Sequence, residues 1–130
     1  MATSPTARTL QLCKEMGWPA GVVERWIERA KKRIDLFGCI DVVALPERKI
    51  ERYWQGPLWI RDILGIQCCT GSGHAAHVTK AKAEPRLRRW LAANGSYEVW
   101  SWYKYVKPIE RKYWRVRREA ITLADLGDKL

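Results

Sequence analysis

The pattern of apolar and polar positions predicts two helices in the first quarter of the chain. Ala7–Met16 has one apolar side at helical spacing, and Gly17 is placed to end it. Gly21–Lys32 shows a stronger stripe of the same kind, and the opposite side of this segment is charged. The stripe consists of Val22, Val23, Trp26, Ile27 and Ala30.

Short apolar runs follow, and these predict strands rather than helices. Arg33–Phe37 and Cys39–Leu45 are separated at Gly38, and Pro46 ends the second run. Glu47–Pro57 is predicted to be a polar loop, and a third strand is placed at Ile63–Cys69.

The second half repeats the change from helix to strand. After a Gly-Ser-Gly turn, a helix is predicted from about His74 to Ala93, kinked or split in two by Pro85. Strands are then predicted over Tyr97–Val106 and Lys112–Thr122. This order predicts an α/β fold with a central mixed sheet flanked by helices. We expect a single domain with its core at about residues 20–122 and with loose ends at 1–6 and 123–130.

Charge changes this picture from a fold to a class of function. The 130 residues include 24 Lys and Arg against 14 Asp and Glu, which gives a net charge of +10. Eight Trp and five Tyr accompany this charge. A small basic domain rich in aromatic residues is typical of proteins that bind nucleic acid.

Several other classes do not fit the sequence. No apolar run approaches the ~20 residues of a membrane span. Met1–Leu10 lacks the apolar segment of a secretory leader, so we expect a cytoplasmic location. The four cysteines include an adjacent pair, Cys68 and Cys69, which makes a disulfide framework improbable.

Two polar residues interrupt apolar strands and are therefore candidates for chemistry. Asp41 lies in the run Ile-Asp-Val-Val-Ala-Leu, where a buried carboxylate is costly unless it is paired or binds a metal. Gln67 lies near the end of the third strand, on the same face as Cys69. Neighbouring strands in a central sheet would bring Asp41 and Gln67 side by side. A salt-bridged core Asp and a hydrogen-bonded core Gln are the structural alternatives.

The helix after Gly73 carries His74, His77 and Lys80 at spacings of three residues, near one face. Its N-terminus could hold a phosphate with free N–H groups. Three other motifs are weaker. A zinc set of Cys68, Cys69 and the two histidines lacks spaced ligand pairs. The Thr70–Gly73 turn lacks the Gly-Lys-Ser/Thr of a nucleotide loop. Cys69 as a nucleophile would be buried.

Two segments together resemble the PD-(D/E)XK nuclease superfamily. They are Asp35–Leu45 and Gly65–His74, each with one polar residue in an apolar strand, within an αβββαβ order. The resemblance covers about residues 20–120. The chain is similar in particular to small nucleases of phages and mobile elements, including Holliday-junction-resolvase-like proteins. It implies a restriction-endonuclease-like core and a metal-dependent DNA endonuclease.

The resemblance also implies roles for individual residues. Asp41 matches the first acidic position, Gln67 the second and Cys69 the lysine position. A glutamine oxygen can still bind a hard cation such as Mg²⁺ or Mn²⁺. Glu24 is expected to complete the metal site, with Glu28 and Asp35 as alternatives. Lys80 replaces the missing lysine, and His77 or His74 contacts the scissile phosphate or assists proton transfer.

Basic residues outside this site are expected to hold the DNA backbone. The expected nucleic-acid contacts are His74, Arg86, Arg89, Lys104, Arg115, Arg117, Lys49 and Arg52. Branched or otherwise structured DNA is the expected substrate, since no separate module for reading sequence is present, and a homodimer is the expected assembly. The alternative function is a non-catalytic nucleic-acid-binding protein on the same fold.

Overall fold

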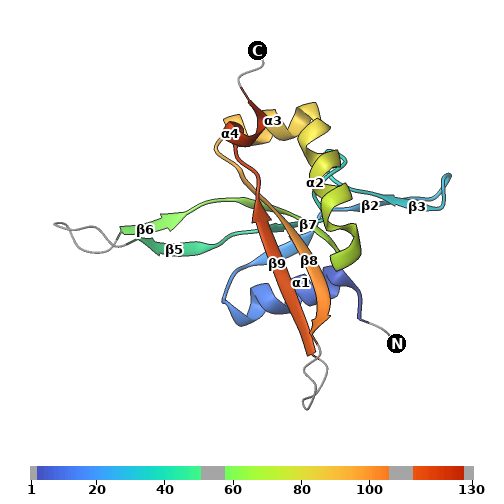
Figure 1. The fold of residues 1–130 in the computed structure, drawn as a ribbon, viewed down its shortest axis with the longest axis horizontal. Coiled ribbons are helices and arrows are strands. Elements are labelled where there is room, and N and C mark those ends of the chain that lie inside the picture. The colour runs from blue at the N-terminus through green and yellow to red at the C-terminus, as the bar shows by residue number, and fades with distance from the viewer. Residues whose placement is uncertain (1–2, 51–57, 106–112, 128–130) are drawn as a thin grey trace.

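The computed structural model describes residues 3–50, 58–105 and 113–127, with the backbone alone for 48–50 and 58–61. Its centre is a five-stranded sheet in the order β1-β4-β7-β8-β9 (Figure 1). These strands are β1 (Ala20–Val22), β4 (Val42–Ala44), β7 (Leu64–Thr70), β8 (Ser96–Tyr105) and β9 (Tyr113–Ala120). β7 and β8 run parallel and all other neighbours antiparallel, which confirms the predicted α/β fold with a mixed sheet.

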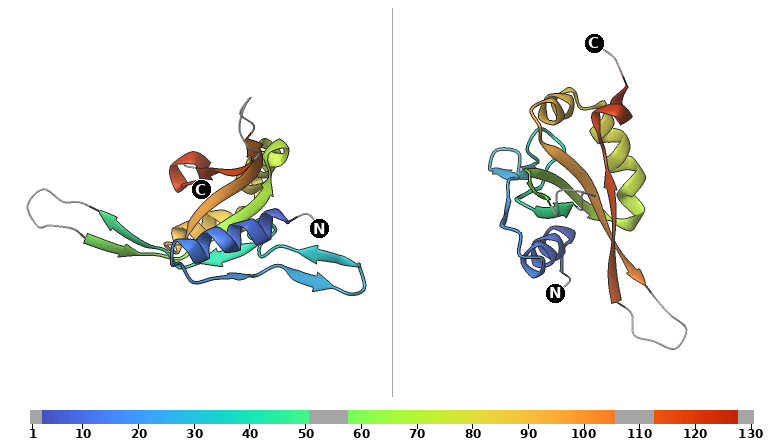
Figure 2. Two further views of the ribbon diagram at one scale, coloured as in Figure 1. Left: turned by 90° about the horizontal axis from the view of Figure 1, so that it is seen from below. Right: turned by 90° about the vertical axis from the view of Figure 1, so that its left-hand side faces the viewer.

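Helices cover both faces of this sheet (Figure 2). α1 (Pro5–Glu15) packs on one face. On the other face, α2 (His74–Ala83) and α3 (Pro85–Ala92) form the crossover that a parallel pair of strands requires. The short helix α4 (Leu123–Leu126) is attached to α3, because Arg88 donates hydrogen bonds to the carbonyls of Leu126 and Gly127.

Two apolar clusters, one on each face, form the core. The cluster under α1 contains Cys13, Val42, Ala44, Leu64, Ile66, Cys68 and Trp100. The cluster under α2 and α3 contains Cys39, Ile40, Cys69, Ala81, Leu87, Tyr97, Val99 and Ile121. Because side chains alternate along a strand, Ile66 and Cys68 face α1 while Gln67 and Cys69 face the other way. The fold thus points Gln67 to the side of α2, on the same face as Cys69, as the sequence predicted.

The predicted long helix is split in two at Pro85, as the sequence indicated. Glu84 separates the two pieces, and its side chain accepts a hydrogen bond from the backbone N–H of Arg86 at the start of α3. Pro85 occupies the first turn of α3, where its missing N–H costs nothing. Asn94 adopts a left-handed φ of 71° just after α3, which ends the helix as predicted.

The helix predicted over Gly21–Lys32 is wrong. This segment contains β1 and a separate hairpin of β2 (Arg25–Ile27) and β3 (Lys32–Ile34), in which Trp26 pairs with Arg33. Its apolar residues are not buried as a helical stripe would be, since Trp26 is 51% exposed. β-Branched and aromatic residues favour strands, and Lys31 takes the left-handed φ of 51° that the turn needs.

Three other boundaries also differ from the prediction. Regular pairing in Cys39–Leu45 is limited to β4, because residues 36–40 form a tight turn closed by a Leu36–Ile40 bridge. The first four residues of the predicted polar loop form β5 (Glu47–Ile50), which pairs with β6 (Leu58–Arg61), while 51–57 lie outside the described residues. In the tail, Thr122 and Asp125 form the capping box that starts α4.

Gly95→Ala is expected to lower the free energy of unfolding by about 1–3 kcal/mol, the usual cost of overpacking a filled site. A Cβ at Gly95 would lie 2.5 Å from Nε1 of Trp90, whose ring donates a 2.8 Å hydrogen bond to the Ser96 carbonyl. Urea denaturation measures the loss. Gly21→Ala is the control, since a Cβ there meets nothing within 4 Å. Equal stability of both variants would contradict the prediction.

Candidate metal and nucleic-acid site

Three carboxylates meet at one end of β4. One oxygen atom from each of Glu24, Asp35 and Asp41 lies within 4.8 Å of the other two. Asp41 is buried, with 4% of its surface exposed, and the other two are partly buried. No other group of three or more His, Cys, Asp or Glu residues of this kind exists in the described part of the chain. We call these three residues the acidic cluster.

The β2–β3 hairpin brings the acidic cluster together. The chain leaves the sheet after β1, and Glu24 stands at the start of the hairpin and Asp35 at its end. Backbone hydrogen bonds from Val23 N–H to the Asp41 carbonyl (2.9 Å) and from Asp41 N–H to the Ile66 carbonyl (2.9 Å) hold Asp41 between β1 and β7. Glu24 and Asp35, eleven positions apart in the sequence, are thereby placed next to Asp41 on the sheet.

Gln67 lies beside Asp41, as the sequence predicted. Its Nε2 donates a 2.6 Å hydrogen bond to Oδ2 of Asp41, and the backbone N–H of Cys68 donates a second one of 2.8 Å to the same oxygen. Gln67 is 3% exposed, so this contact is made inside the protein. Both bonds fix the orientation of the Asp41 carboxyl.

The electrostatics of the acidic cluster favour a cation. Burial, followed by a hydrogen bond with Asp35, raises the pKa of Asp41 to about 8, and the charges of Asp35 and Glu24 act in the same direction. The hydrogen bond from Cys68 opposes this shift of the pKa. Arg33 provides one nearby positive charge, 3.0 Å from Oε1 of Glu24. At neutral pH Asp41 therefore holds a proton that a bound cation would displace.

Helix α2 carries both His77 and Lys80, and His77 lies within electrostatic reach of the acidic cluster. Burial, then the charge of Lys80, lowers the pKa of His77, while the negative charge of Asp35 acts against this shift. These influences place His77 within electrostatic reach of both Lys80 and Asp35. Nδ1 of His77 is buried and has no hydrogen-bond partner among the described residues. His77 is thus a neutral imidazole at neutral pH, able to accept a proton.

His74 does not take the position expected of a phosphate contact. It is 3% exposed, and its Nδ1 lies 2.7 Å from Oγ of Ser101 while its Nε2 lies 2.8 Å from Oε1 of Glu119. The spacing of three residues put His74 and His77 near one face, but α2 begins against β8 and β9, so its first residue points into the protein. The prediction for His74 is corrected to a structural role.

The cysteines do not support the two rival chemistries. All four are buried and free, and burial, followed by the charge of Asp41, raises the pKa of the Cys69 thiol to about 11. A thiol protonated at neutral pH is a poor nucleophile. Cys68 faces α1, away from Cys69, and the described residues contain no zinc-like cluster of cysteine and histidine.

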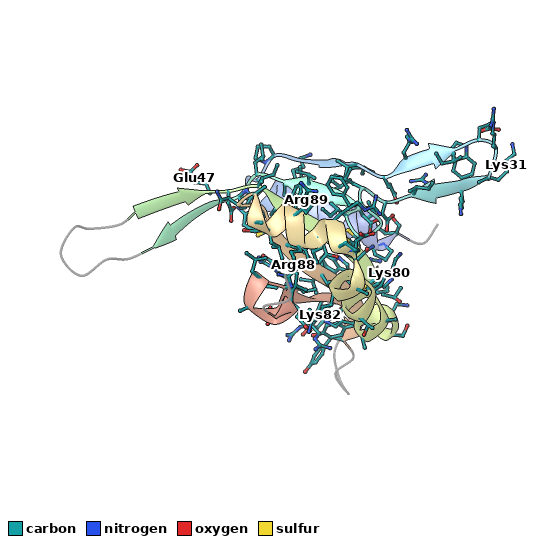
Figure 3. All side chains as sticks on the ribbon, turned by 90° about the horizontal axis from the view of Figure 1, so that it is seen from above. Lys31, Glu47, Lys80, Lys82, Arg88 and Arg89 are labelled. Carbon is teal, nitrogen blue, oxygen red and sulfur yellow. The ribbon has the colours of Figure 1, made fainter. Side chains whose placement is uncertain are left out.

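Most of the expected DNA contacts lie on the surface. Arg86, Arg89, Lys104, Arg115 and Arg117 are exposed, and Figure 3 shows Arg89 on α3. Four of them have partners: Arg86 binds Glu84 at 2.6 Å, Arg117 lies 3.3 Å from Glu119, Arg115 stacks on Tyr105, and Lys104 lies over the ring of Trp114. The side chain of Lys49 and the whole of Arg52 lie outside the described residues.

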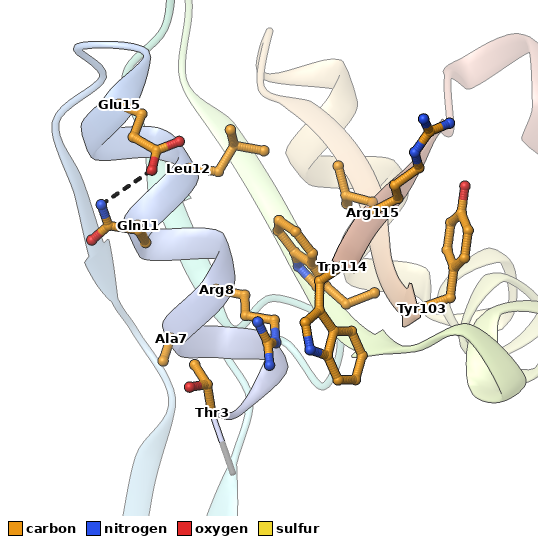
Figure 4. Close-up of a pocket in the computed structure, with 11 residues that line it drawn as sticks. Thr3, Ala7, Arg8, Gln11, Leu12, Glu15, Tyr103, Trp114 and Arg115 are labelled. Atoms are coloured by element: carbon orange, nitrogen blue, oxygen red, sulfur yellow. Dashed lines mark hydrogen bonds between the residues drawn. The ribbon is translucent and has the colours of Figure 1, made fainter. Parts of the chain in front are cut away.

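A separate hollow lies on the α1 side of the sheet, opposite to Gln67 (Figure 4). Its volume is about 700 Å³, and α1, β8 and β9 line it. Arg8 stacks on Trp114 there, with 3.9 Å between its guanidinium carbon and the ring centroid. No residue of the acidic cluster lines this hollow.

The sequence named Glu24 for the metal site but placed it on a helix face, whereas it stands at the base of a hairpin. Asp35 was left as an open alternative and is a member of the cluster. The signal that could have found them is the turn between two short runs rich in β-branched and aromatic residues.

Within the described residues, no helix is long and apolar enough to cross a membrane. Searches found no match to this chain among protein-family models, curated proteins or solved structures.

Proposed function

We propose that the protein is a metal-dependent DNA endonuclease of the PD-(D/E)XK type. The observation that carries the proposal is the acidic cluster, whose Asp41 is buried beside Gln67, in a protein of net charge +10. Three carboxylates gathered in a basic protein are costly without a counter-ion, and a basic surface attracts a polyanion. Glu24, Asp35 and Asp41 would hold a divalent cation, which would supply positive charge to the carboxylates and to a bound phosphodiester.

The order of elements supports the same proposal. α1, β1, β4, β7, the α2–α3 crossover and β8 follow the αβββαβ order that the resemblance implies. Asp41 stands at the start of the second sheet strand and Gln67 in the middle of the third, side by side. The resemblance expects its two metal-binding positions on these strands.

The donor atoms fit a hard divalent cation. Carboxylate oxygens from Glu24, Asp35 and Asp41 and the amide oxygen of Gln67 are the ligand types that Mg²⁺ and Mn²⁺ prefer. In phosphodiester hydrolysis such a cation supplies charge neutralisation and a more acidic water. Because Gln67 is neutral, we expect weaker metal binding than four carboxylates would give.

The chain's own groups supply the remaining steps. Lys80 is exposed on α2 near His77 and offers a positive charge to the phosphate. His77, neutral at neutral pH, accepts a proton at a ring nitrogen from the attacking water. Cys69, at the lysine position of the family, remains protonated and takes no part in proton transfer.

A non-catalytic nucleic-acid-binding protein is the second candidate. The observation that favours it is the hydrogen bond from Gln67 Nε2 to Asp41 Oδ2, because this bond occupies a carboxylate oxygen that a metal ion would need. Both candidates bind DNA with a dependence on salt. They differ in cleavage alone.

Cleavage of DNA in the presence of Mg²⁺ or Mn²⁺, and its absence in EDTA, is the expected result for the wild-type protein. Branched, duplex and single-stranded DNA are compared, with Asp41→Ala assayed beside the wild type. We expect branched or duplex DNA to be cut and Asp41→Ala to be inactive. Binding without cleavage by the wild type would favour the second candidate. Equal cleavage by both proteins would remove Asp41 from the site.

A further inference from the structure

The β2–β3 hairpin is the most strongly basic projection that the structure describes. Residues 25–34 contain five basic residues and one acidic residue, a net charge of +4. The hairpin leaves the body of the protein on the side of α2, as Figure 1 shows, and Figure 3 shows Lys31 at its far end. Every residue of this segment except Ile27 is exposed.

Folding alone does not explain this composition. An isolated two-stranded hairpin is marginally stable in water, and residues that pack on the core would normally support it. Here Trp26 and Ile34 are 51% and 43% exposed, so they contribute little to either core cluster. The exposed surface of the hairpin combines cations with an aromatic ring, which is the chemistry of a nucleic-acid contact.

Internal contacts order the hairpin and leave most of its cations available. Glu28 accepts bonds from Nε1 of Trp26 (2.8 Å) and from Nζ of Lys31 (2.6 Å), which fixes the indole ring near the turn. Arg33 is tied to Glu24 at the base. Arg25, Arg29 and Lys32 carry exposed positive charge along the hairpin.

The hairpin also starts and ends at the acidic cluster. Glu24 precedes β2 and Asp35 follows β3, so the base of the hairpin is the wall of the candidate metal site. From this base to Arg29 at the turn, five residues of extended chain reach roughly 15 Å. A nucleic acid held along the hairpin therefore passes within a few nucleotides of Asp41.

We propose that the β2–β3 hairpin lies in a groove of duplex DNA and contacts its phosphates, which places one strand against the acidic cluster. The proposal rests on the nuclease function and names its substrate form. A two-stranded ribbon fits the major groove, which is about 12 Å wide. Arg29 and Lys32 contact phosphates on the groove walls, and Trp26 packs on the sugar–base edge.

The test is the binding of a short DNA duplex by fluorescence anisotropy in EDTA, over a range of salt concentrations. Arg29→Ala/Lys32→Ala is expected to bind about tenfold more weakly at moderate salt, with a log–log salt slope reduced by about 2. The matched control is Lys14→Ala/Lys82→Ala, which removes two exposed charges from α1 and α2. We expect its affinity to stay within about twofold of wild type.

A second variant separates direct contact from the general electrostatic field. Trp26→Ala leaves the charge unchanged, and we expect weaker duplex binding, by about threefold or more, with an unchanged salt slope. Thermal melting of each variant shows that the body of the protein remains folded. Equal losses in the hairpin and control variants, or wild-type binding by both hairpin variants, would overturn the proposal, as would loss of single-stranded but not duplex binding.

These outcomes are independent of cleavage, because EDTA removes the metal. A wild-type protein that binds duplex DNA through the hairpin but never cuts it would refute the nuclease function and leave the hairpin contact standing. A protein that cuts DNA while the hairpin variants bind normally would refute the hairpin contact alone.

Discussion

Asp35→Asn is expected to reduce metal-dependent cleavage by at least about a hundredfold. Loss of an outer partner of a metal ligand typically costs about 10–100-fold, and Asp35 contributes an oxygen directly to the acidic cluster. The same change removes a negative charge and a hydrogen bond that raise the pKa of Asp41. The variant should therefore melt at a higher temperature than the wild type in EDTA, while its cleavage rate falls.

A matched control is available in Asp62→Asn. Asp62 is also partly buried and accepts a hydrogen bond from Ser96 at 3.0 Å, but it does not belong to the acidic cluster. Initial rates on a labelled duplex, with Mn²⁺ in excess, measure the effect. We expect wild-type rates from Asp62→Asn. A rate for Asp35→Asn within tenfold of wild type would show that Asp35 is not a ligand.

Glu28 provides a further contrast. The sequence left Glu28 as an alternative to Glu24, one helical turn away. The structure has no helix there, and Glu28 instead lies in the hairpin turn, bonded to Lys31. Glu28→Gln should therefore bind Mn²⁺ as the wild type does, whereas Glu24→Gln should bind it more weakly.

The part of the site that lies on the sheet was predictable, and the part on the hairpin was not. Asp41 and Gln67 each interrupt a strongly apolar strand, and the β4–β7 register places Val42 opposite Ile66. A single polar residue in a buried strand is a local signal, because burial of a carboxylate needs a physical reason. The contact between Asp41 and Gln67 then follows from the pairing of two consecutive sheet strands.

The hairpin was not predicted because the pattern of apolar residues in this segment is compatible with both a helix and a pair of strands. Val22, Val23, Trp26 and Ile27 have helical spacing, yet each of these residue types also favours a strand. Tertiary contacts decide between the helix and the strands. Because β1 pairs with β4, residues 23–41 must connect these two neighbouring strands. Glu24 was selected for the metal site from a wrong local structure, and the structure reaches the same residue through the hairpin base.

His74 shows the limit of spacing arguments on a helix. Its separation from His77 predicted a shared role, but Ser101 and Glu119 on β8 and β9 engage both of its ring nitrogens. Ser101 and Glu119 follow His74 in the chain by 27 and 45 residues, so no local pattern reports the contacts. The difference between the two histidines is a property of the fold.

In metal-free buffer, the stability of the wild-type protein is expected to fall as pH rises from about 4 to about 8, through the contribution of Asp41. The folded protein holds the proton of Asp41 up to a pKa of about 8, whereas the unfolded chain releases it near the ordinary value of 3.8. Between these values the folded state binds the extra proton, so each pH unit lowers the free energy of unfolding by at most about 1.4 kcal/mol.

His77 acts in the opposite direction and must be separated from Asp41. Its pKa is lowered in the folded protein, so its contribution to stability grows as pH rises toward the ordinary value of 6.5. The difference in stability between the wild type and Asp41→Asn does not include the contribution of His77, because both proteins contain His77. An asparagine oxygen can accept the same hydrogen bonds from Gln67 and Cys68, so the variant is expected to fold.

Metal should reverse the trend in the wild type alone. A divalent cation binds the ionised form of Asp41, so its affinity, and the rise in melting temperature that it causes, should increase with pH up to about 8. Melting temperatures from about pH 5 to about pH 8.5, in EDTA and in excess Mn²⁺, give both slopes. Asp41→Asn should show a smaller loss of stability with pH and little stabilisation by Mn²⁺. Parallel curves for the two proteins under both conditions would mean that Asp41 is ionised without metal, and that the acidic cluster needs no cation.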